Sequence, residues 1–156
     1  MWFRVTSQEF ASNGNRGNRR GLEELVASRR RPGLLGYLGR TPVGWVSVAP
    51  RPEFGRVERS PILKPVDDKQ VWAIVCFYID RHHRGNGVAS ELLRAAVDYA
   101  AARGARVIEG YPIDVKRKRS VASAELFVGT VDMFAAAGFV EVERRSPTRP
   151  IMRYRV

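Results

Sequence analysis

Two glycines one residue apart stand where a helix is expected to begin. The stretch Arg84-Gly85-Asn86-Gly87-Val88-Ala89 follows the apolar run Val71–Ile79 and opens the helical pattern of Val88–Arg103. A helix N-terminus offers free N–H groups and partial positive charge, and phosphate oxygens satisfy both. The glycines let a phosphate approach the backbone closely, and Arg84 adds a cation. The turn therefore predicts a phosphate-binding site rather than a simple helix start.

A dinucleotide is one candidate ligand for this turn. The fingerprint of dinucleotide-binding proteins is matched except at its last position, which is Ser90, and Glu109 follows about 20 residues further on, as that fingerprint requires. However, four polar residues, Arg81–Arg84, separate the strand from Gly85, whereas the fingerprint turn follows its strand closely. Too little chain remains for a doubly wound sheet. The sequence therefore disfavours a nicotinamide cofactor.

The elements that position the turn form a mixed sheet. Val88, Leu92, Ala96 and Tyr99 recur at helical spacing, and Gly104 follows as a stop signal. A strand–helix–strand unit implies a parallel pair with a right-handed crossover. The remaining hairpins imply antiparallel neighbours. We predict strands over Trp2–Val5, Leu34–Leu38, Val43–Val48, Val71–Ile79, Arg106–Ile113, Phe139–Arg144 and Ile151–Val156, further helices over Gly21–Arg30 and Thr130–Ala137, and loops over Ser12–Gly21 and Ala49–Gln70.

The composition indicates one folded domain over residues 1–156. Hydrophobic residues make up 44% of the chain, enough for a core that we expect to include Trp45 and Trp72. The loop Ala49–Gln70 is long enough to serve as a binding loop or lid. Cys76, the single cysteine, excludes an intrachain disulfide and favours a reducing cytoplasm. Nothing in the sequence places a base beside Cys76, which disfavours a covalent route through its thiol.

The net charge of +11 favours anionic partners without choosing among them. The excess is spread over Arg16–Arg31, Lys116–Arg119 and Arg144–Arg155, which favours a solvated surface over a nucleic-acid groove. The N-terminus lacks the apolar segment of a signal peptide, and no run approaches the roughly 20 apolar residues of a membrane span. We therefore expect no membrane partner.

The chain resembles the GNAT superfamily of acyl-CoA-dependent N-acyltransferases. Arg84-Gly85-Asn86-Gly87-Val88-Ala89 matches the Arg/Gln-x-x-Gly-x-Gly/Ala signature of that family. The strand before the signature, the long helix after it and the segment Phe134–Phe139 fall where the family has them. In element order the match runs from about Leu34 to the C-terminus, and residues 1–31 carry no motif of the family.

The resemblance implies an α/β (α+β) fold with a mixed, mostly antiparallel sheet of about six to seven strands and helices on both faces. Its central parallel pair is splayed, and acetyl-CoA lies in the gap. The pantetheine pairs with the strand backbone, the pyrophosphate meets the amides of the turn, and the acceptor amine enters from the opposite side. The implied cofactor-binding residues are Phe77, Tyr78, Ile79, Arg84, Gly85, Asn86, Gly87, Val88, Ala89 and Phe134, and we predict no metal site.

Direct attack of an amine on a thioester asks for a neutral amine, a donor to the thioester oxygen and a proton for the leaving thiolate. A backbone N–H near Phe77 or Tyr78 is the implied donor. Glu109 is the first candidate for the base, and an ordinary ion pair is the alternative. Many family members carry a tyrosine acid where this chain has Phe134. Tyr111, a water molecule, or no acid at all must then serve.

The sequence therefore predicts a cytoplasmic N-acetyltransferase that acts on a primary amine of a small molecule or peptide. A non-catalytic acyl-CoA sensor is the first alternative, because Phe134 stands at the usual acid position. A basic nucleic-acid-binding protein is the second, because of the Lys116–Arg119 run. A homodimer is left open.

Overall fold

Six strands form one mixed sheet in the order β1-β2-β3-β4-β6-β5. The computed structural model describes residues 1–28 and 30–156. Only β3 and β4 run parallel, and the other neighbouring strands are antiparallel, as expected. The strands are β1 (Leu34–Leu38), β2 (Thr41–Pro50), β3 (Trp72–Ile79), β4 (Val107–Gly110), β5 (Val140–Glu143) and β6 (Ile151–Arg155).

The parallel pair separates after three residues. β3 pairs with β4 at Trp72, Ala73 and Ile74 only, although β3 continues to Ile79. In the pairing of β3 with β2, Val48 lies opposite Ile74 and Ser47 opposite Cys76, so Val75 is an extra residue on β3. Such a bulge bends its strand and increases the local twist. The second half of β3 is therefore free of β4, which confirms the predicted splay.

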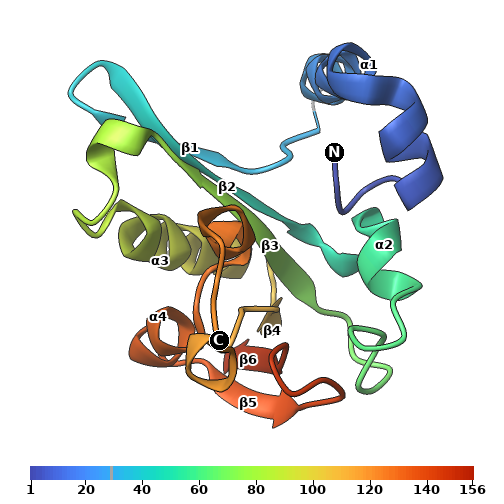
Figure 1. Ribbon diagram of the computed structural model, residues 1–156, viewed down its shortest axis with the longest axis vertical. Coiled ribbons are helices and arrows are strands. Elements are labelled where there is room, and N and C mark those ends of the chain that lie inside the picture. Colours follow the sequence, from blue (N-terminus) through green and yellow to red (C-terminus); the bar gives the residue numbers. More distant parts are fainter. Residues whose placement is uncertain (29) are drawn as a thin grey trace.

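Helices lie on both faces of the sheet (Figure 1). The helix α3 (Val88–Ala101) packs on β1, β2 and β3, and α4 (Val131–Ala136) lies on the same face. A second buried cluster on the other face includes Phe54 and Val57 of the segment around α2 (Gly55–Glu58). None of the described helices is long and apolar enough to cross a membrane.

The N-terminal region is more helical than predicted. The helix α1 (Ser7–Ala27) occupies the predicted loop Ser12–Gly21 and absorbs most of the predicted helix Gly21–Arg30, although Arg29 lies outside the described residues. A capping box between Thr6 and Glu9 starts the helix, and Gly14 kinks it with a φ of 57°. None of its described side chains is buried. Local caps and ion pairs therefore stabilise a helix in a segment whose glycines and asparagines predict a loop.

Three further predictions are wrong in detail. Residues Trp2–Val5 form a turn rather than a strand, with the amide of Arg4 bonded to the carbonyl of Met1 at 2.8 Å. The predicted strand Arg106–Ile113 ends at Gly110, because its partner β3 has diverged there. The loop Ala49–Gln70 contains the short helices η1 (Arg51–Glu53) and α2.

Contrary to the prediction, Trp45 does not join the core. Its strand neighbour Gly44 faces Leu92 of α3, so Trp45 points to the opposite face of the sheet. There it is half-buried and belongs to neither buried cluster. Trp72, in contrast, packs against the first cluster and meets Tyr99 edge to face at 6.0 Å.

Candidate active site

The glycine turn adopts a backbone that only glycine takes without strain. Gly85 and Gly87 have φ angles of 79° and 77°. A Cβ added at either residue would meet no atom within 4 Å. Packing therefore does not explain these glycines. Their backbone conformation does, together with open space through which a ligand can approach the chain.

The N-terminus of α3 leaves backbone donors without partners in the helix. Ser90 donates the first intrahelical hydrogen bond, to the carbonyl of Gly87 at 2.9 Å. The N–H groups of Val88 and Ala89 precede it and have no acceptor inside the helix. Gly87 is the N-cap and no side chain caps this end among the described residues. Free amides, the helix dipole and open space together suit an anion.

Side chains of residues 80–84 hold the glycine turn in place. Asp80 accepts hydrogen bonds from the amide of His82 and the ring of His83, both at 3.0 Å. The pKa of Asp80 is lowered by these bonds, chiefly the one from His83. Arg84 donates its Nε–H to the carbonyl of Ile79 at 3.1 Å. Asp80 and Arg84 thus fix the turn at the end of β3, and the other Arg84 donors have no partner among the described residues.

A cavity of about 540 Å³ extends from the turn along the free half of β3. Eight of the ten predicted cofactor-binding residues line it, and the other two, Asn86 and Phe134, do not. The eight are Phe77, Tyr78, Ile79, Arg84, Gly85, Gly87, Val88 and Ala89. The structure thus brings the turn and the splayed strand together in one cavity.

The far wall of the cavity was not predicted. It comes from η4 (Ser123–Val128) and the start of α4, after the point where β4 ends. No periodic pattern in residues 114–129 signalled this segment, although Thr130 is a recognisable N-cap of α4. The unpredicted lining residues are His83, Ser90, Ser123, Ala124, Leu126, Phe127, Gly129, Thr130 and Met133.

Phe134 lies in the core beside the cavity. Its ring has an exposed fraction of 0% and meets Phe139 edge to face at 4.9 Å. A Cβ on Gly110 would come within 2.0 Å of this ring, so Gly110 lets it pack directly on β4. Phe134 therefore supports the end of β4 from inside the protein, and its predicted contact with the pantetheine stays a prediction.

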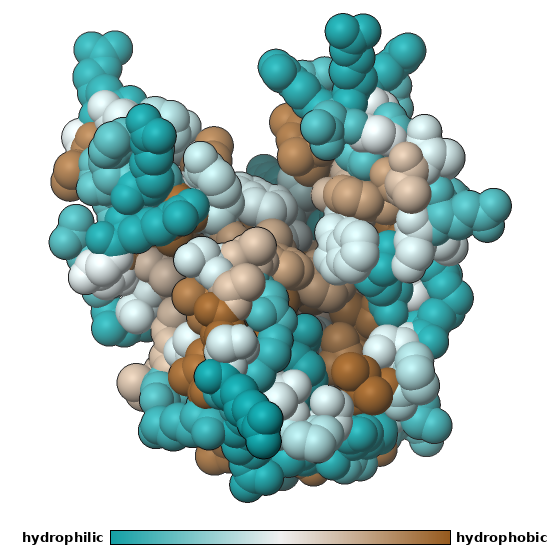
Figure 2. Space-filling view, viewed as in Figure 1, coloured by the Kyte–Doolittle hydropathy of each residue, from teal (hydrophilic) through white to brown (hydrophobic). Residues whose placement is uncertain are grey.

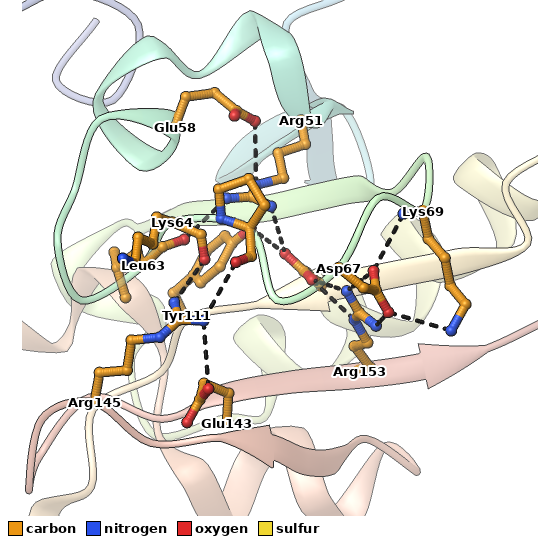
Figure 3. A network of polar contacts seen from close by, with 12 residues as sticks. Arg51, Glu58, Leu63, Lys64, Asp67, Lys69, Tyr111, Glu143, Arg145 and Arg153 are labelled. Atoms are coloured by element: carbon orange, nitrogen blue, oxygen red, sulfur yellow. Dashed lines mark hydrogen bonds and ion pairs between the residues drawn. The ribbon is translucent and has the colours of Figure 1, made fainter.

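The two predicted catalytic residues lie outside the cavity lining, in a buried ionic cluster. Glu109 has an exposed fraction of 0%. Its carboxylate accepts hydrogen bonds from the Tyr111 hydroxyl at 2.6 Å and from Arg153 Nε at 2.9 Å. Arg51 lies 3.7 Å from the same carboxylate. Figure 3 shows Arg51 of η1, Tyr111 just after β4 and Arg153 of β6 in one network of polar contacts.

The same cluster clamps the long loop Ala49–Gln70. Arg153 also binds both carboxylate oxygens of Asp67, at 2.6 and 2.8 Å, and the hydrogen bonds from Arg153 lower the pKa of Asp67. Arg51 donates to the carbonyl of Leu63, and Arg145 donates to the carbonyls of Lys64 and Pro65 (Figure 3). Three arginines thus fasten a loop that the sequence left free to act as a lid.

The cluster leaves Glu109 and Tyr111 poorly suited to proton transfer. Burial raises the pKa of Tyr111 well above its ordinary value, and the neighbouring Glu109 carboxylate adds to this effect. Tyr111 therefore holds its proton firmly, which makes it a weak general acid. Glu109 is already engaged by a hydroxyl and a guanidinium. The geometry favours a structural role for both residues, and kinetics must test the catalytic one.

Substitution of Glu109 by glutamine tests the predicted base. A positioned general base contributes roughly 10²- to 10⁴-fold to a rate. We expect Glu109→Gln to lower the turnover number less than about tenfold at temperatures where the variant is folded, because the carboxylate lies outside the cavity lining. Steady-state kinetics alongside thermal melting measure both effects. A turnover loss of about a hundredfold in a folded variant would reinstate Glu109 as the base.

Cys76 is a poor nucleophile where it lies. Burial raises the pKa of its thiol to about 11, so the thiolate is scarce at neutral pH. Its thiol donates only a long contact of 3.9 Å to the carbonyl of Phe77. The structure supports the expectation that Cys76 forms no covalent intermediate.

Comparison with known proteins agrees with this geometry. Residues 2–126 match the acetyltransferase (GNAT) family. Among solved structures, the fold is similar to ribosomal-protein-alanine N-acetyltransferase from Brucella melitensis, with 17% identity, a TM-score of 0.56, and 89% of this chain and 77% of that chain covered. An N-acetyltransferase from Staphylococcus aureus Mu50 is 14% identical with a TM-score of 0.52, covering 90% of this chain and 75% of that chain.

A third similar structure is that of the NatC complex bound to Gag peptide and CoA. It is 11% identical with a TM-score of 0.52, covering 88% of this chain and 79% of that chain. At these identities the structures establish the shared fold and nothing finer. A search of curated proteins finds no significant match. Because the family match covers most of the chain, the protein belongs to the acetyltransferase (GNAT) family and is an acetyltransferase.

Proposed function

We propose that the protein transfers an acetyl group from acetyl-CoA to a primary amine by direct attack. The observation that carries this proposal is the cavity shared by the glycine turn and the free half of β3. A helix N-terminus with free amides at one end and an unpaired strand edge at the other suit a ligand with a pyrophosphate and a long amide-bearing arm. Acetyl-CoA has this form and supplies an activated thioester.

The residues fit this ligand in three places. The amides of Gly87, Val88 and Ala89 and the Arg84 side chain would hold the pyrophosphate. The backbone of Phe77–Ile79, which has no partner on β4, would pair with the pantetheine amides. A backbone N–H next to the β3 bulge would donate to the thioester oxygen as charge develops there. Positioning and hydrogen bonding would then account for most of the rate acceleration.

No side chain needs to act as the acid in this scheme. A free thiol has a pKa of about 8.5, so a thiolate leaves readily near neutral pH. Phe134 has no proton to give, and Tyr111 is buried away from the cavity. We propose that the amine loses its proton to water, with Glu109 and Tyr111 fixing the strand β4 and the long loop.

A nucleic-acid role is the weaker alternative. Three residues of the basic run Lys116–Arg119 form ion pairs: Lys116 with Asp132, Arg117 with Asp114 and Lys118 with Glu125. Carboxylates of the same protein thus already neutralise much of this run. A steep dependence of RNA or DNA retention on salt concentration would be needed to revive this alternative.

Calorimetric titration and a thiol-release assay test the proposal. We expect the protein to bind acetyl-CoA and CoA at submillimolar concentration and to release CoA thiol only when an amine is added. NADH serves as the control ligand and should not bind. Absence of acetyl-CoA binding would refute the proposal, and binding without thiol release from any acceptor would favour the sensor alternative.

The remaining predictions concern the acceptor class, the location and the partners of the protein. One similar structure is a ribosomal-protein-alanine N-acetyltransferase and another is bound to Gag peptide and CoA, so a peptide amine stays in the proposal beside small-molecule amines. We also propose a cytoplasmic location and no membrane partner, and a homodimer is left open.

A further inference from the structure

Three side chains form a row across one end of the sheet, and the two outer ones are exposed. Leu35 of β1 lies directly opposite Trp45 of β2, and Trp45 lies opposite Tyr78 of β3. Directly paired residues place their side chains on the same face. Leu35 and Tyr78 each have an exposed fraction of 58%, and Trp45 is half-buried. Because neighbouring strands lie about 4.8 Å apart, the row spans roughly 10 Å, the size of a bulky side chain.

This row lies on the face away from α3. Gly36 and Gly44, the sequence neighbours of Leu35 and Trp45, both approach Leu92 of α3. The alternation of strand side chains therefore turns the row toward the side on which α1 lies. Figure 2 shows a hollow between α1 and the β1–β2 hairpin, in the same view as Figure 1.

The row is continuous with the cavity of the proposed reaction. Tyr78 belongs to the row and also lines the cavity, in the half of β3 that has left β4. An apolar group resting on Leu35 and Trp45 would thus hold its amine beside the free backbone of β3. Large exposed aromatic and aliphatic side chains next to a cavity commonly mark a binding surface.

The charges of the cavity lining disfavour a polycationic acceptor. None of the residues lining the cavity in the described part of the chain is acidic, and His83 and Arg84 are its titratable basic groups. The nearby carboxylate of Asp80 is occupied by His82 and His83. The whole chain carries a net charge of +11, which repels cations at long range. An acceptor with several ammonium groups would find no counter-charge along this lining.

We propose that Leu35, Trp45 and Tyr78 form the acceptor platform, and that the acceptor is a primary amine bearing an apolar or aromatic group. The inference rests on the proposed acetyl transfer. The amine nitrogen forms the bond to the acetyl carbon, the carbon–sulfur bond breaks with its electron pair leaving on sulfur, and the amine proton passes to water. Aromatic rings also attract a single ammonium before it loses its proton.

Matched amines test the platform with the full chain at saturating acetyl-CoA. Phenethylamine is compared with ethylamine, and phenylalanine amide with glycine amide, while lysine amide is the cationic match. We expect kcat/KM for the aromatic member of at least one pair to exceed that of its partner by roughly tenfold or more, with lysine amide below phenylalanine amide. Equal values within both pairs, or a preference for lysine amide, would overturn the inference.

Variants of the three platform residues test whether these side chains cause the preference for aromatic amines. Leu35→Ser is a surface change that should not impair folding, and Trp45→Ala removes the largest ring. Both should bring the aromatic-to-small ratio of kcat/KM toward one. Tyr78→Phe should keep the ratio because it keeps the ring. Val140→Ser is the control, since Val140 is an equally exposed apolar residue (62%) on the far edge strand β5. An unchanged ratio in both Leu35→Ser and Trp45→Ala would refute the assignment.

The outcomes separate this inference from the proposed function. Failure to bind acetyl-CoA removes the proposed function itself. Binding of acetyl-CoA with turnover of only small or cationic amines overturns the platform alone, whereas binding with no turnover of any amine in the panel removes the proposed transfer and the platform together. Sedimentation of the wild type and Leu35→Ser supplies a further check, because a dimer that Leu35→Ser converts to a monomer would assign the row to a second copy of the chain.

Discussion

Replacing Gly87 by alanine is expected to weaken acetyl-CoA binding by about tenfold to a hundredfold. Hydrogen bonds to a charged group contribute about 1.5–3 kcal/mol each, and every 1.4 kcal/mol is a factor of ten. A Cβ at Gly87 would enter the open space beside the free amides of Val88 and Ala89, and would keep a phosphate from them. Titration calorimetry with CoA measures the loss.

A second glycine at the other end of the same helix gives a matched control. Gly104 has a φ of 85°, close to the 77° of Gly87, and a Cβ there also meets no atom within 4 Å. Both alanine variants should therefore lose about 1–2 kcal/mol of folding free energy to backbone strain. Gly104 does not line the cavity. Equal loss of CoA affinity in the two variants would show that strain, and not phosphate contact, is responsible.

Replacing Arg153 by methionine is expected to destabilise the fold by about 3–5 kcal/mol. Removal of one partner of a buried ion pair leaves an uncompensated charge, and its cost lies in this range. Here the carboxylate of Glu109 would keep only the Tyr111 hydroxyl and Arg51 at 3.7 Å. For a chain of this length the loss corresponds to a fall in Tm of about 6–20 °C. Thermal melting and urea unfolding measure it.

A double variant and a single-residue control show whether the unpaired Glu109 charge causes the loss of stability in Arg153→Met. Glu109→Gln combined with Arg153→Met removes the buried negative charge, so it should recover much of the stability that Arg153→Met loses. Asp67→Asn breaks only the partly exposed side of the cluster and should cost less than Arg153→Met. If the double variant is as unstable as the sum of the two single variants, the cluster is not held by this charge pair.

The glycine turn and its helix could be predicted from the sequence because the information is local. The turn at residues 84–89 places two glycines in the left-handed backbone conformation at the start of a helix. That conformation depends only on residues close by in the sequence. The stripe of Val88, Leu92 and Ala96 likewise needs only its own spacing to define α3. The N-terminal helix had local signals as well, in the Thr6–Glu9 capping box and the Arg19–Glu23 pair, but its glycines outweighed them.

The partners of Glu109 could not be predicted in this way. Arg153 reaches Glu109 because β6 lies beside β4 with these two residues directly opposite, and Asp67 reaches Arg153 from a loop 86 residues earlier. Such contacts depend on strand order and register. A carboxylate on a strand that lines a predicted gap looks like a base until those neighbours are known. Trp45 is a similar case, since its alternating pattern does not say which face of the sheet remains uncovered.

The amino-acid sequence by itself thus determined where this protein has a glycine turn at a helix start and which strand leads to it. Only the tertiary structure decided that Glu109 and Tyr111 belong to a buried cluster, that η4 lines the cavity, and that Leu35, Trp45 and Tyr78 stand in one row. The physical reason is the range of the interactions. Backbone conformation and helix ends depend on residues a few positions apart, whereas burial, ion pairing and cavity walls depend on segments that meet only after the sheet has formed.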